Sequence, residues 1–391
     1  MRGDNGDFPG RQARRGAVAG KAFGVVVLGG YGHFGRLIVE RISGIGGCEA
    51  WVGGRDRDRA TAMARQYGAR VLHVDLCDPG LAERLRSTGA SLVIHAAGPF
   101  QHLDLRVAEA ALSAGMHYVD LADGRAHVLG IDALDARARA LDRLVCSGAS
   151  SVPALSGAVV DALRPRFARL QGVHVGITAS AQAPGRATLA SVLSWCGRPL
   201  PRSGPGVGVA HGLQGPVRHV FPAPLGTRWL LDCDVPDLAL LPRRHPDLAA
   251  VRFSAGLGLD LYQLGGWLLS WPVRWGLLPD PVPLAGAMQA IAQRLAPLGD
   301  GCSGMFVSLS GSDHDGRPLS LCWELVAERE HGLYVPCAAS IAIARALATG
   351  RLRARGAMPC VGLLGLDDVL DELAGLSVRA GLREDAGATT R

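Results

Sequence analysis

Residues 23–35 read FGVVVLGGYGHFG, and they are the most informative stretch of the chain about its fold. Phe23–Leu28 is a continuous apolar run rich in β-branched residues, which is typical of a strand buried on both faces. It leads directly into a glycine-rich turn. The next apolar residues are spaced for one face of a helix: Phe34, Leu37, Ile38 and Ile42. The stretch therefore predicts a buried strand, a tight loop and a helix, which together begin a βαβ unit.

The alternation of strands and helices continues to about residue 147. Five more strands are predicted, at Cys48–Val52, Val71–Leu76, Ser91–Ala96, His117–Leu121 and Leu144–Ser147. Helices are predicted between them at Arg57–Tyr67, Leu105–Ala114 and Ile131–Leu141. Six short strands with intervening helices predict an α/β fold with a Rossmann-like, doubly wound parallel sheet.

Beyond Val160 this alternation stops. Short strands are predicted at 172–179, 217–221, 228–231, 251–255, 305–310 and 319–327, with a helix near 283–298, which favours a mostly antiparallel sheet. The apolar helix Cys337–Leu347 requires burial, and we expect it to return to the first domain. We predict a disordered tail (1–22), the Rossmann domain (23–160), an inserted α+β substrate and dimerisation domain (161–330), C-terminal helices on the Rossmann domain (331–375) and a flexible tail (376–391).

The glycines of the first loop have the spacing of a dinucleotide fingerprint. Gly30-x-Gly32-x-x-Gly35 follows a predicted strand and opens a predicted helix, which is the context that the fingerprint requires. Gly30 permits the turn, Gly32 lets the backbone approach a diphosphate, and Gly35 lets helix and strand pack closely. The alternative is a tight turn that binds nothing. We predict that the loop binds a cofactor through Gly30, Tyr31, Gly32, His33, Phe34 and Gly35.

The residue twenty positions past Gly35 indicates which dinucleotide is bound. This residue is Arg55, preceded by two glycines, and a guanidinium suits the 2′-phosphate of NADP. The alternative is that Asp56 binds the ribose, which would favour NAD. Asp75 could bind the adenine edge or cap the next turn. The Ala97-Gly98-Pro99 stretch follows the fourth strand, at the sheet edge where ligands bind, and is predicted to line the cofactor.

The composition excludes several classes of function. Lys21 is the only lysine, so the predicted domains have none for a Schiff base, a P-loop or a Tyr-x-x-x-Lys relay. Nine dispersed cysteines without a CxxC pair predict reduced thiols, a cytoplasmic location and no metal site. Residues 1–22 carry half of the net charge of +6, which leaves no basic stripe for nucleic acid. Neither a secretory signal nor a membrane-spanning helix is expected.

Several motifs resemble the saccharopine dehydrogenase-like (saccharopine reductase) family, and in particular its bacterial members. They are GGYGHFG, GGRD, VDLCD, HAAGPFQ, HYVDLADG and SGASSVPALSGAVVD in the first half, and GMFVSLSGSDHDGRPL, YVPCAASIAIARAL and PCVGLLGLDDVLDEL in the second. The resemblance spans about residues 23–375. It implies an NAD(P)-dependent oxidoreductase acting on an amine or its imine, or on an enoyl-type double bond. It also supports Gly30, Gly32, Gly35, Arg55, Asp75 and Gly98 as cofactor contacts. The lysine base of some relatives has no counterpart here.

The candidate proton-transfer residues follow the predicted strands. His102 is the first candidate, because an imidazole titrates near neutrality; Tyr118 and Asp120 are the others. Asp120 could instead hold loop amides. Arg186 is a candidate anchor for a substrate carboxylate, and the alternative is a solvated surface charge.

Three functions are consistent with these residues. The first is an NADP-dependent oxidoreductase (NAD being possible) that moves a hydride to or from a small imine, amine or keto substrate. The second is a non-catalytic NAD(P)-binding sensor or scaffold. The third is an enoyl-type reductase acting on an apolar substrate at a membrane surface, suggested by the tryptophan-rich segment Leu261–Leu278. That segment could equally form core, a substrate wall or a homodimer contact, and we expect Pro272 to break any single helix there.

Overall fold

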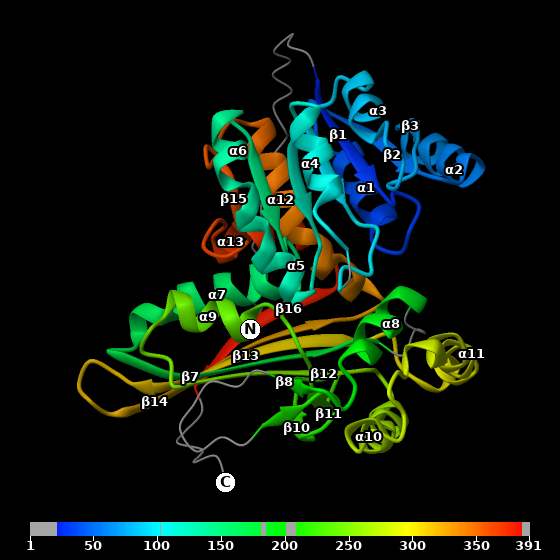
Figure 1. Cartoon of the computed structure of the whole chain (residues 1–391). Coiled ribbons are helices and arrows are strands. Elements are labelled where there is room, and N and C mark those ends of the chain that lie inside the picture. The colour runs from blue at the N-terminus through cyan, green and yellow to red at the C-terminus, as the bar shows by residue number, and fades with distance from the viewer. Residues whose placement is uncertain (1–21, 102, 181–184, 201–208, 385–391) are drawn as a thin grey trace, which may run out of the picture.

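The computed structural model describes residues 22–101, 103–180, 185–200 and 209–384, with only the backbone given for Arg186, Ala187 and Leu298. Figure 1 shows two sheets, one above the other. The upper sheet is parallel and seven-stranded. Its strand order is β15 (Gly356–Pro359), β6 (Leu144–Ser147), β5 (His117–Asp120), β4 (Leu92–His95), β1 (Phe23–Leu28), β2 (Cys48–Gly54) and β3 (Arg70–His73). The predicted doubly wound sheet is thus confirmed.

Helices cover both faces of the parallel sheet. One core cluster joins the sheet to α1 (Gly35–Ser43), α2 (Arg57–Tyr67) and α12 (Val335–Ala348). A second cluster, on the other face, joins it to α3 (Leu81–Ser87), α4 (Arg106–Ser113) and α6 (Asp135–Ala140). The shorter helices α5 (Arg125–Gly130) and α13 (Leu366–Leu370) lie at the end of the parallel sheet that faces the mixed sheet (Figure 1). Burial of the sheet on both faces explains why its strands are continuous apolar runs.

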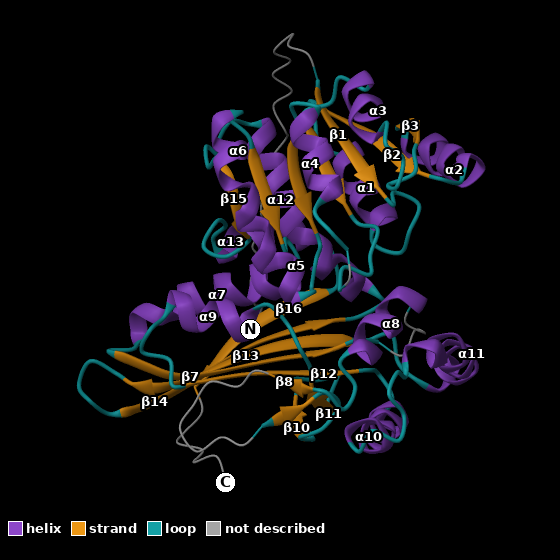
Figure 2. Ribbon diagram, viewed as in Figure 1, coloured by secondary structure: helices purple, strands orange, loops and turns teal. Residues whose placement is uncertain are grey.

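The lower sheet is mixed, and all of its strands except the last, which follows α12, belong to a domain inserted between β6 and α12. Its order is β10 (Val217–Val220), β11 (Thr227–Asp232), β12 (Ala250–Gly256), β7 (Arg169–Thr178), β13 (Ser303–Ser312), β14 (Pro318–Ala327) and β16 (Val378–Glu384). Only the β12–β7 pair is parallel. Helices α7 (Ser156–Leu163) and α9 (Asp237–Arg244) lie between the two sheets (Figure 2).

The remaining elements of the inserted domain lie at one end of the mixed sheet. They are α8 (Arg186–Ser194), α10 (Asp260–Arg274), α11 (Ala285–Leu295) and the two-stranded ribbon of β8 (Pro199–Leu200) and β9 (Ala210–His211). The inserted α+β domain and the helices that return to the first domain agree with the sequence prediction.

Two strands near the C-terminal end differ from the prediction. Gly356–Pro359 forms β15 and adds a seventh strand to the parallel sheet beside β6. Val378–Glu384, predicted as part of a flexible tail, forms β16 and pairs with β14 along seven residues. Four of the seven residues of β16 are Arg, Glu or Gly, a composition that indicates a tail. An edge strand carries such residues readily, because one side of it faces solvent.

The segment Leu261–Leu278 also differs from the prediction. It contains one continuous helix, α10, that runs through Pro272. Because this proline lies two residues before the helix end, it removes one hydrogen bond from the last turn rather than from the middle. Leu261, Leu264 and Leu268 are exposed along one side of the helix. No residue of the segment lines the cavity described below.

One segment of the described chain, His331–Ala348, is long and apolar enough to cross a membrane by length and composition alone. Eleven of the fourteen residues of its helical part, α12, are buried, and they pack against α1, α13 and the segment η2 (Ser151–Leu155). This helix is therefore a core element of the fold, as the predicted burial of Cys337–Leu347 requires.

Candidate functional site

The glycine-rich loop joins β1 to α1 at the carboxyl edge of the parallel sheet. A Cβ at Gly32 would lie 2.9 Å from the carbonyl oxygen of Gly29, and one at Gly35 would lie 2.8 Å from the Gly29 carbonyl carbon. The first turn of α1 has no side-chain cap, since Phe34 makes no capping hydrogen bond. The amides of His33, Phe34 and Gly35 make no backbone hydrogen bond within the described chain, so they are open to an anion, which the dipole of the helix favours there.

The loop lies where the strand order of the sheet reverses. β4 lies on one side of β1 and β2 on the other, so the crevice above β1 is the topological switch point. The loop that follows β4 closes this crevice: a Cβ at Gly29 would lie 3.0 Å from the Cβ of Ala97. The predicted cofactor residues of the first loop and Ala97-Gly98-Pro99 are therefore brought together.

The predicted 2′-phosphate site gains a second arginine. The Tyr31 ring packs over Gly54, where a Cβ would collide with the ring, and the Tyr31 hydroxyl accepts a hydrogen bond from the Asp56 amide at 3.0 Å. The Arg59 guanidinium lies 4.7 Å above the Tyr31 ring. Arg55 lies at the end of β2, and its guanidinium makes no ion pair with any described residue. Two guanidinium groups thus lie near the end of β2, and sequence reasoning found only one.

The two acidic residues near this site have structural partners. The carboxylate of Asp56 accepts a hydrogen bond from the Arg59 amide at 3.0 Å and so caps α2. Asp75 accepts one from the Cys77 amide at 2.9 Å, which is the turn-capping alternative left open by the sequence. With Asp56 engaged as a cap, the arrangement favours a 2′-phosphate over a bare ribose hydroxyl at this position.

The predicted catalytic residues Tyr118 and Asp120 are buried below the cofactor edge. Asp120 accepts hydrogen bonds from the Ser147 hydroxyl and the Gly148 amide, both at 2.8 Å, and from the Ala122 amide at 3.0 Å. Tyr118 is 1% exposed, and its hydroxyl lies 3.0 Å from His95 Nδ1. Asp120 therefore holds the loops after β5 and β6, and neither side chain lines the cavity described below. A catalytic role for either one stays a prediction.

His127, which sequence reasoning missed, is the side-chain partner of Asp120. Its Nε2 lies 3.3 Å from Asp120, and its Nδ1 lies 3.1 Å from the carbonyl oxygen of Leu103. Burial alone would lower the pKa of His127, but the Asp120 carboxylate outweighs it and raises that pKa. Burial alone would raise the pKa of Asp120. The hydrogen bond and charge interaction with His127, together with two loop amides, outweigh burial and lower that pKa. The pair fixes the loop after β4 from below.

Two other predicted residues cannot be placed at the site. His102 lies outside the described residues. Arg186 begins α8, but its side chain also lies outside the described part of the chain. Their roles in proton transfer and carboxylate binding stay predictions.

A polar contact joins the two domains near the same edge. The Gln101 side chain donates to Asp123 at 3.0 Å and also to Ser191 of α8. Arg125 forms an ion pair with the buried Asp234 at 2.8 Å. These contacts hold α8 and the loop after β11 beneath the parallel sheet.

A cavity of about 120 Å³ lies between the glycine loop and the mixed sheet. Its apolar wall includes Phe34, Ile177, Met305, Leu325, Leu333 and Val335, and its polar groups are Ser151, Thr178, Ser180, Ser303 and Glu330. Phe34 belongs to the predicted cofactor loop and Ser151 follows β6, while Ile177 and Met305 come from the mixed sheet. The cavity therefore lies beside the cofactor edge, with walls from both domains. Sequence reasoning missed it because its residues lie up to 302 positions apart.

Glu330 lies on this cavity in an unusual backbone conformation. Arg329 and Glu330 have φ angles of 55° and 61°, in the left-handed region that residues other than glycine seldom adopt. Two such residues cost about 1–3 kcal/mol each, and such strain gathers at functional sites. The Glu330 carboxylate reaches toward the glycine loop: burial and Arg36 lower the pKa of His33, and the charge of Glu330 opposes that shift.

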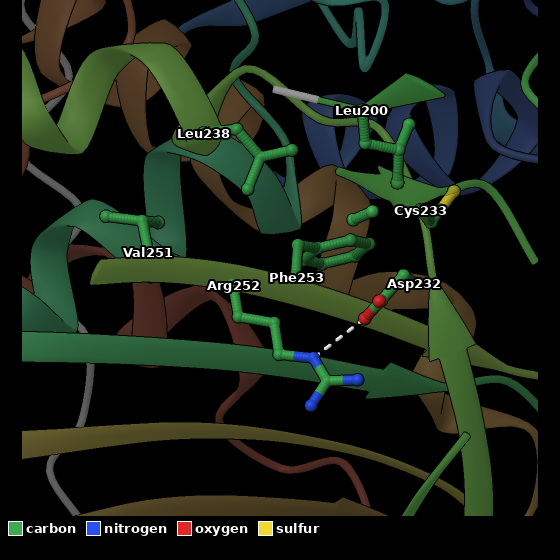
Figure 3. Close-up of a pocket in the computed structure, with 8 residues that line it drawn as sticks. Leu200, Asp232, Cys233, Leu238, Val251, Arg252 and Phe253 are labelled. Atoms are coloured by element: carbon green, nitrogen blue, oxygen red, sulfur yellow. Dashed lines mark hydrogen bonds and ion pairs between the residues drawn. The ribbon is translucent and has the colours of Figure 1, made fainter. Parts of the chain in front are cut away.

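A second, much smaller cavity lies inside the inserted domain (Figure 3). It measures about 10 Å³ and is bordered by Leu200, Leu238 and the Arg252–Asp232 ion pair, whose atoms are 2.7 Å apart. That volume holds at most one water molecule. On the mixed sheet, donor atoms of His219, Cys322 and Glu324 lie within 4.8 Å of one another, but His219 already bonds Glu324 at 2.7 Å. The predicted absence of a metal stays a prediction.

Comparisons with known proteins agree with this geometry. Residues 25–146 match the family described as saccharopine dehydrogenase NADP binding domain. Apo saccharopine dehydrogenase (L-Glu forming) from Saccharomyces cerevisiae has the same fold, with a TM-score of 0.65 and 11% identity over 93% of this chain and all of that one. Homospermidine synthase from Legionella pneumophila, solved with NAD, gives a TM-score of 0.62 and 13% identity over 95% of this chain and 94% of that one. No curated protein sequence matches the chain.

The fold and the glycine loop define a dinucleotide-binding protein of the Rossmann class, whose first domain is of the NADP-binding kind. Residues 25–146 match the NADP-binding domain of the saccharopine dehydrogenase family, and the whole chain shares its fold with a solved saccharopine dehydrogenase. The resemblance seen in the sequence is thereby confirmed.

Proposed function

We propose that this protein is an NADP-dependent oxidoreductase that transfers a hydride to or from a small imine, amine or keto substrate held between its two domains. One observation carries the proposal: the loop that fits a dinucleotide diphosphate borders the cavity, since Phe34 belongs to both. A ligand in this cavity would lie next to the cofactor edge of the sheet, as a hydride donor and acceptor must.

The residues present fit the cofactor along its length. The amides of His33, Phe34 and Gly35 would hold the diphosphate, because they make no backbone hydrogen bond within the described chain. The loop keeps this shape only with glycine at 32 and 35, since a side chain at either position would collide with the Gly29 backbone. Arg55 and Arg59 would hold the 2′-phosphate, and Ala97-Gly98-Pro99 would line the other side of the crevice. When bound, NADP supplies the site with a hydride donor or acceptor.

The chain itself positions the reactants and excludes water. Asp120 and His127 fix the loops after β4, β5 and β6 by hydrogen bonds to their backbone. The apolar wall of the cavity, formed by Met305, Leu325 and Val335 among others, keeps the dielectric constant low around the substrate. A small-molecule substrate is thus favoured, while the homodimer, the cytoplasmic location and the membrane contact through residues 261–278 stay predictions.

Coenzyme titration tests the proposal. The purified protein is titrated with NADPH and with NADH, and the quenching of its tryptophan fluorescence is followed. We expect tighter binding of NADPH, and Arg55→Ala should weaken NADPH binding at least tenfold more than NADH binding, since each removed charge-assisted contact is worth about 1.5–3 kcal/mol. Arg65→Ala, an exposed position near the other end of α2, is the matched control and should change neither affinity.

Three results would contradict parts of the proposal. Equal losses for both coenzymes in Arg55→Ala would remove the assigned role of Arg55. No affinity for either coenzyme would remove the proposed function altogether. If NADPH binds but is not oxidised with any imine, ketone or enoyl compound, the result favours the non-catalytic sensor instead.

A further inference from the structure

The cavity between the domains is lined, within the described chain, by a single ionisable side chain, which is acidic. Among the described residues that line it, Glu330 is the only one with an ionisable side chain. Glu330 is half-buried and accepts a hydrogen bond from the Ser180 hydroxyl at 2.6 Å, and it forms no ion pair within the described chain. The cavity is otherwise bordered by apolar side chains and a few hydroxyl groups. A carboxylate in such a place lacks the partner that buried charges normally have.

The backbone holds this carboxylate in place. The two left-handed residues Arg329 and Glu330 turn the chain just after β14, and the Glu330 amide donates a hydrogen bond to the carbonyl oxygen of Gly301 at 3.0 Å. The carboxylate also packs against Gly301, where a Cβ would lie 3.2 Å from its Oε1. The turn thus presents a negative charge to the cavity at the expense of local backbone strain.

We propose that Glu330 selects the substrate: an apolar compound that carries one positively charged nitrogen, as a protonated amine or the corresponding protonated imine, and no carboxylate. This inference rests on the proposed function and narrows its three substrate types to one. A cation in the cavity would gain a charge-assisted contact in a surrounding of low dielectric constant. A carboxylate would be repelled by Glu330, and a ketone would gain neither effect.

The chemistry of a protonated imine fits the surroundings of the cavity. Its reduction requires only a hydride: a C–H bond forms at the imine carbon, the π electrons of the C=N bond become the nitrogen lone pair, and NADPH is oxidised to NADP⁺. The product is a neutral amine, so the protein need not deliver a proton in this step. Glu330 keeps the imine protonated, which makes its carbon the stronger electrophile. This agrees with the burial of Tyr118 and Asp120 away from the cavity.

Three probes of one shape test the inference by binding alone. Benzylamine, benzyl alcohol and benzoate are titrated into the full-length protein saturated with NADP⁺, at pH 7, by calorimetry. We expect benzylamine to bind at least tenfold more tightly than benzyl alcohol, and benzoate to bind most weakly. Tighter binding of benzoate would overturn the inference and would support the role of carboxylate anchor predicted for Arg186.

Variants of Glu330 assign the preference to this residue. Glu330→Gln should lose the preference for benzylamine, whereas Glu330→Asp, which keeps the charge, should retain part of it. Ser180→Ala removes the hydrogen bond to Glu330 and should shift benzylamine affinity without abolishing the preference. Glu328→Gln is the matched control, because Glu328 pairs with Arg379 at 2.8 Å and does not line the cavity.

NADPH affinity, measured for every variant, separates this inference from the proposed function. If all variants bind NADPH normally and Glu330→Gln still prefers benzylamine, the inference is wrong and the proposed function stands. If the unaltered protein does not bind NADPH, the proposed function fails first. A Glu330→Gln variant with normal NADPH affinity and no amine preference supports both.

Discussion

Replacing Gly35 by alanine tests the cofactor loop at its most crowded position. The new Cβ would lie 2.8 Å from the Gly29 carbonyl carbon and 2.9 Å from the Gly30 Cα, and closer still to the Gly29 carbonyl oxygen. Carbon atoms in contact are normally about 3.5–4.0 Å apart, so α1 and the loop must separate by about 0.7 Å or more. Both neighbours are backbone, and no side-chain rotation can relieve the collision.

This displacement has two measurable consequences. Overpacking of this kind destabilises the folded state by about 1–3 kcal/mol, which urea unfolding would detect. The loop amides also move away from the positions that fit a diphosphate, so NADPH affinity should fall at least tenfold, or by about 1.4 kcal/mol.

Gly46→Ala is the matched control for this substitution. A Cβ added at Gly46 would have no neighbouring atom of the described chain within 4 Å, so alanine there should change neither stability nor NADPH affinity. If Gly35→Ala binds NADPH as the unaltered protein does, the loop does not hold the diphosphate and the reasoning fails.

Two further predictions concern stability. Because the pKa of His127 is raised in the folded state, its pairing with Asp120 stabilises fully below the unfolded pKa of about 6.5 and less as pH rises through the higher folded value. His127→Gln should therefore cost about 3 kcal/mol at pH 6 and less at pH 9, and urea unfolding that shows an equal cost at both pH values would contradict this. Removing residues 377–391 deletes β16 and its pairing with β14, and should lower the unfolding free energy by more than about 2 kcal/mol. Unchanged unfolding would show that Val378–Glu384 contributes nothing as a strand.

The first domain could be predicted from the sequence because its signals are local. β1 and β6 have the predicted bounds, since a strand buried on both faces is a continuous apolar run with clear ends. The glycine spacing predicted the loop because steric crowding at Gly35 depends only on the adjoining strand and helix. Arg59 was missed, since its place beside Tyr31 depends on the approach of α2 to the loop.

The elements that complete the sheets depend on distant partners. β15 is four residues long and contains a glycine and a proline, so only its neighbour β6 makes it a strand. The residues of β16 have the composition of a polar tail, and they form a strand because they pair with β14. In both cases the pairing energy comes from residues far away in the chain, and no local pattern encodes it.

The class of cofactor can be inferred from the amino-acid sequence alone, because a diphosphate is bound by backbone amides that a short glycine motif exposes. What lies beside that cofactor depends on how the whole chain folds. Phe34, Ser180 and Glu330 are separated by about 150 residues each, and they meet because the inserted domain folds back under the parallel sheet. The charge and shape of a cavity depend on all the residues that line it, so they are defined only once the whole chain is folded.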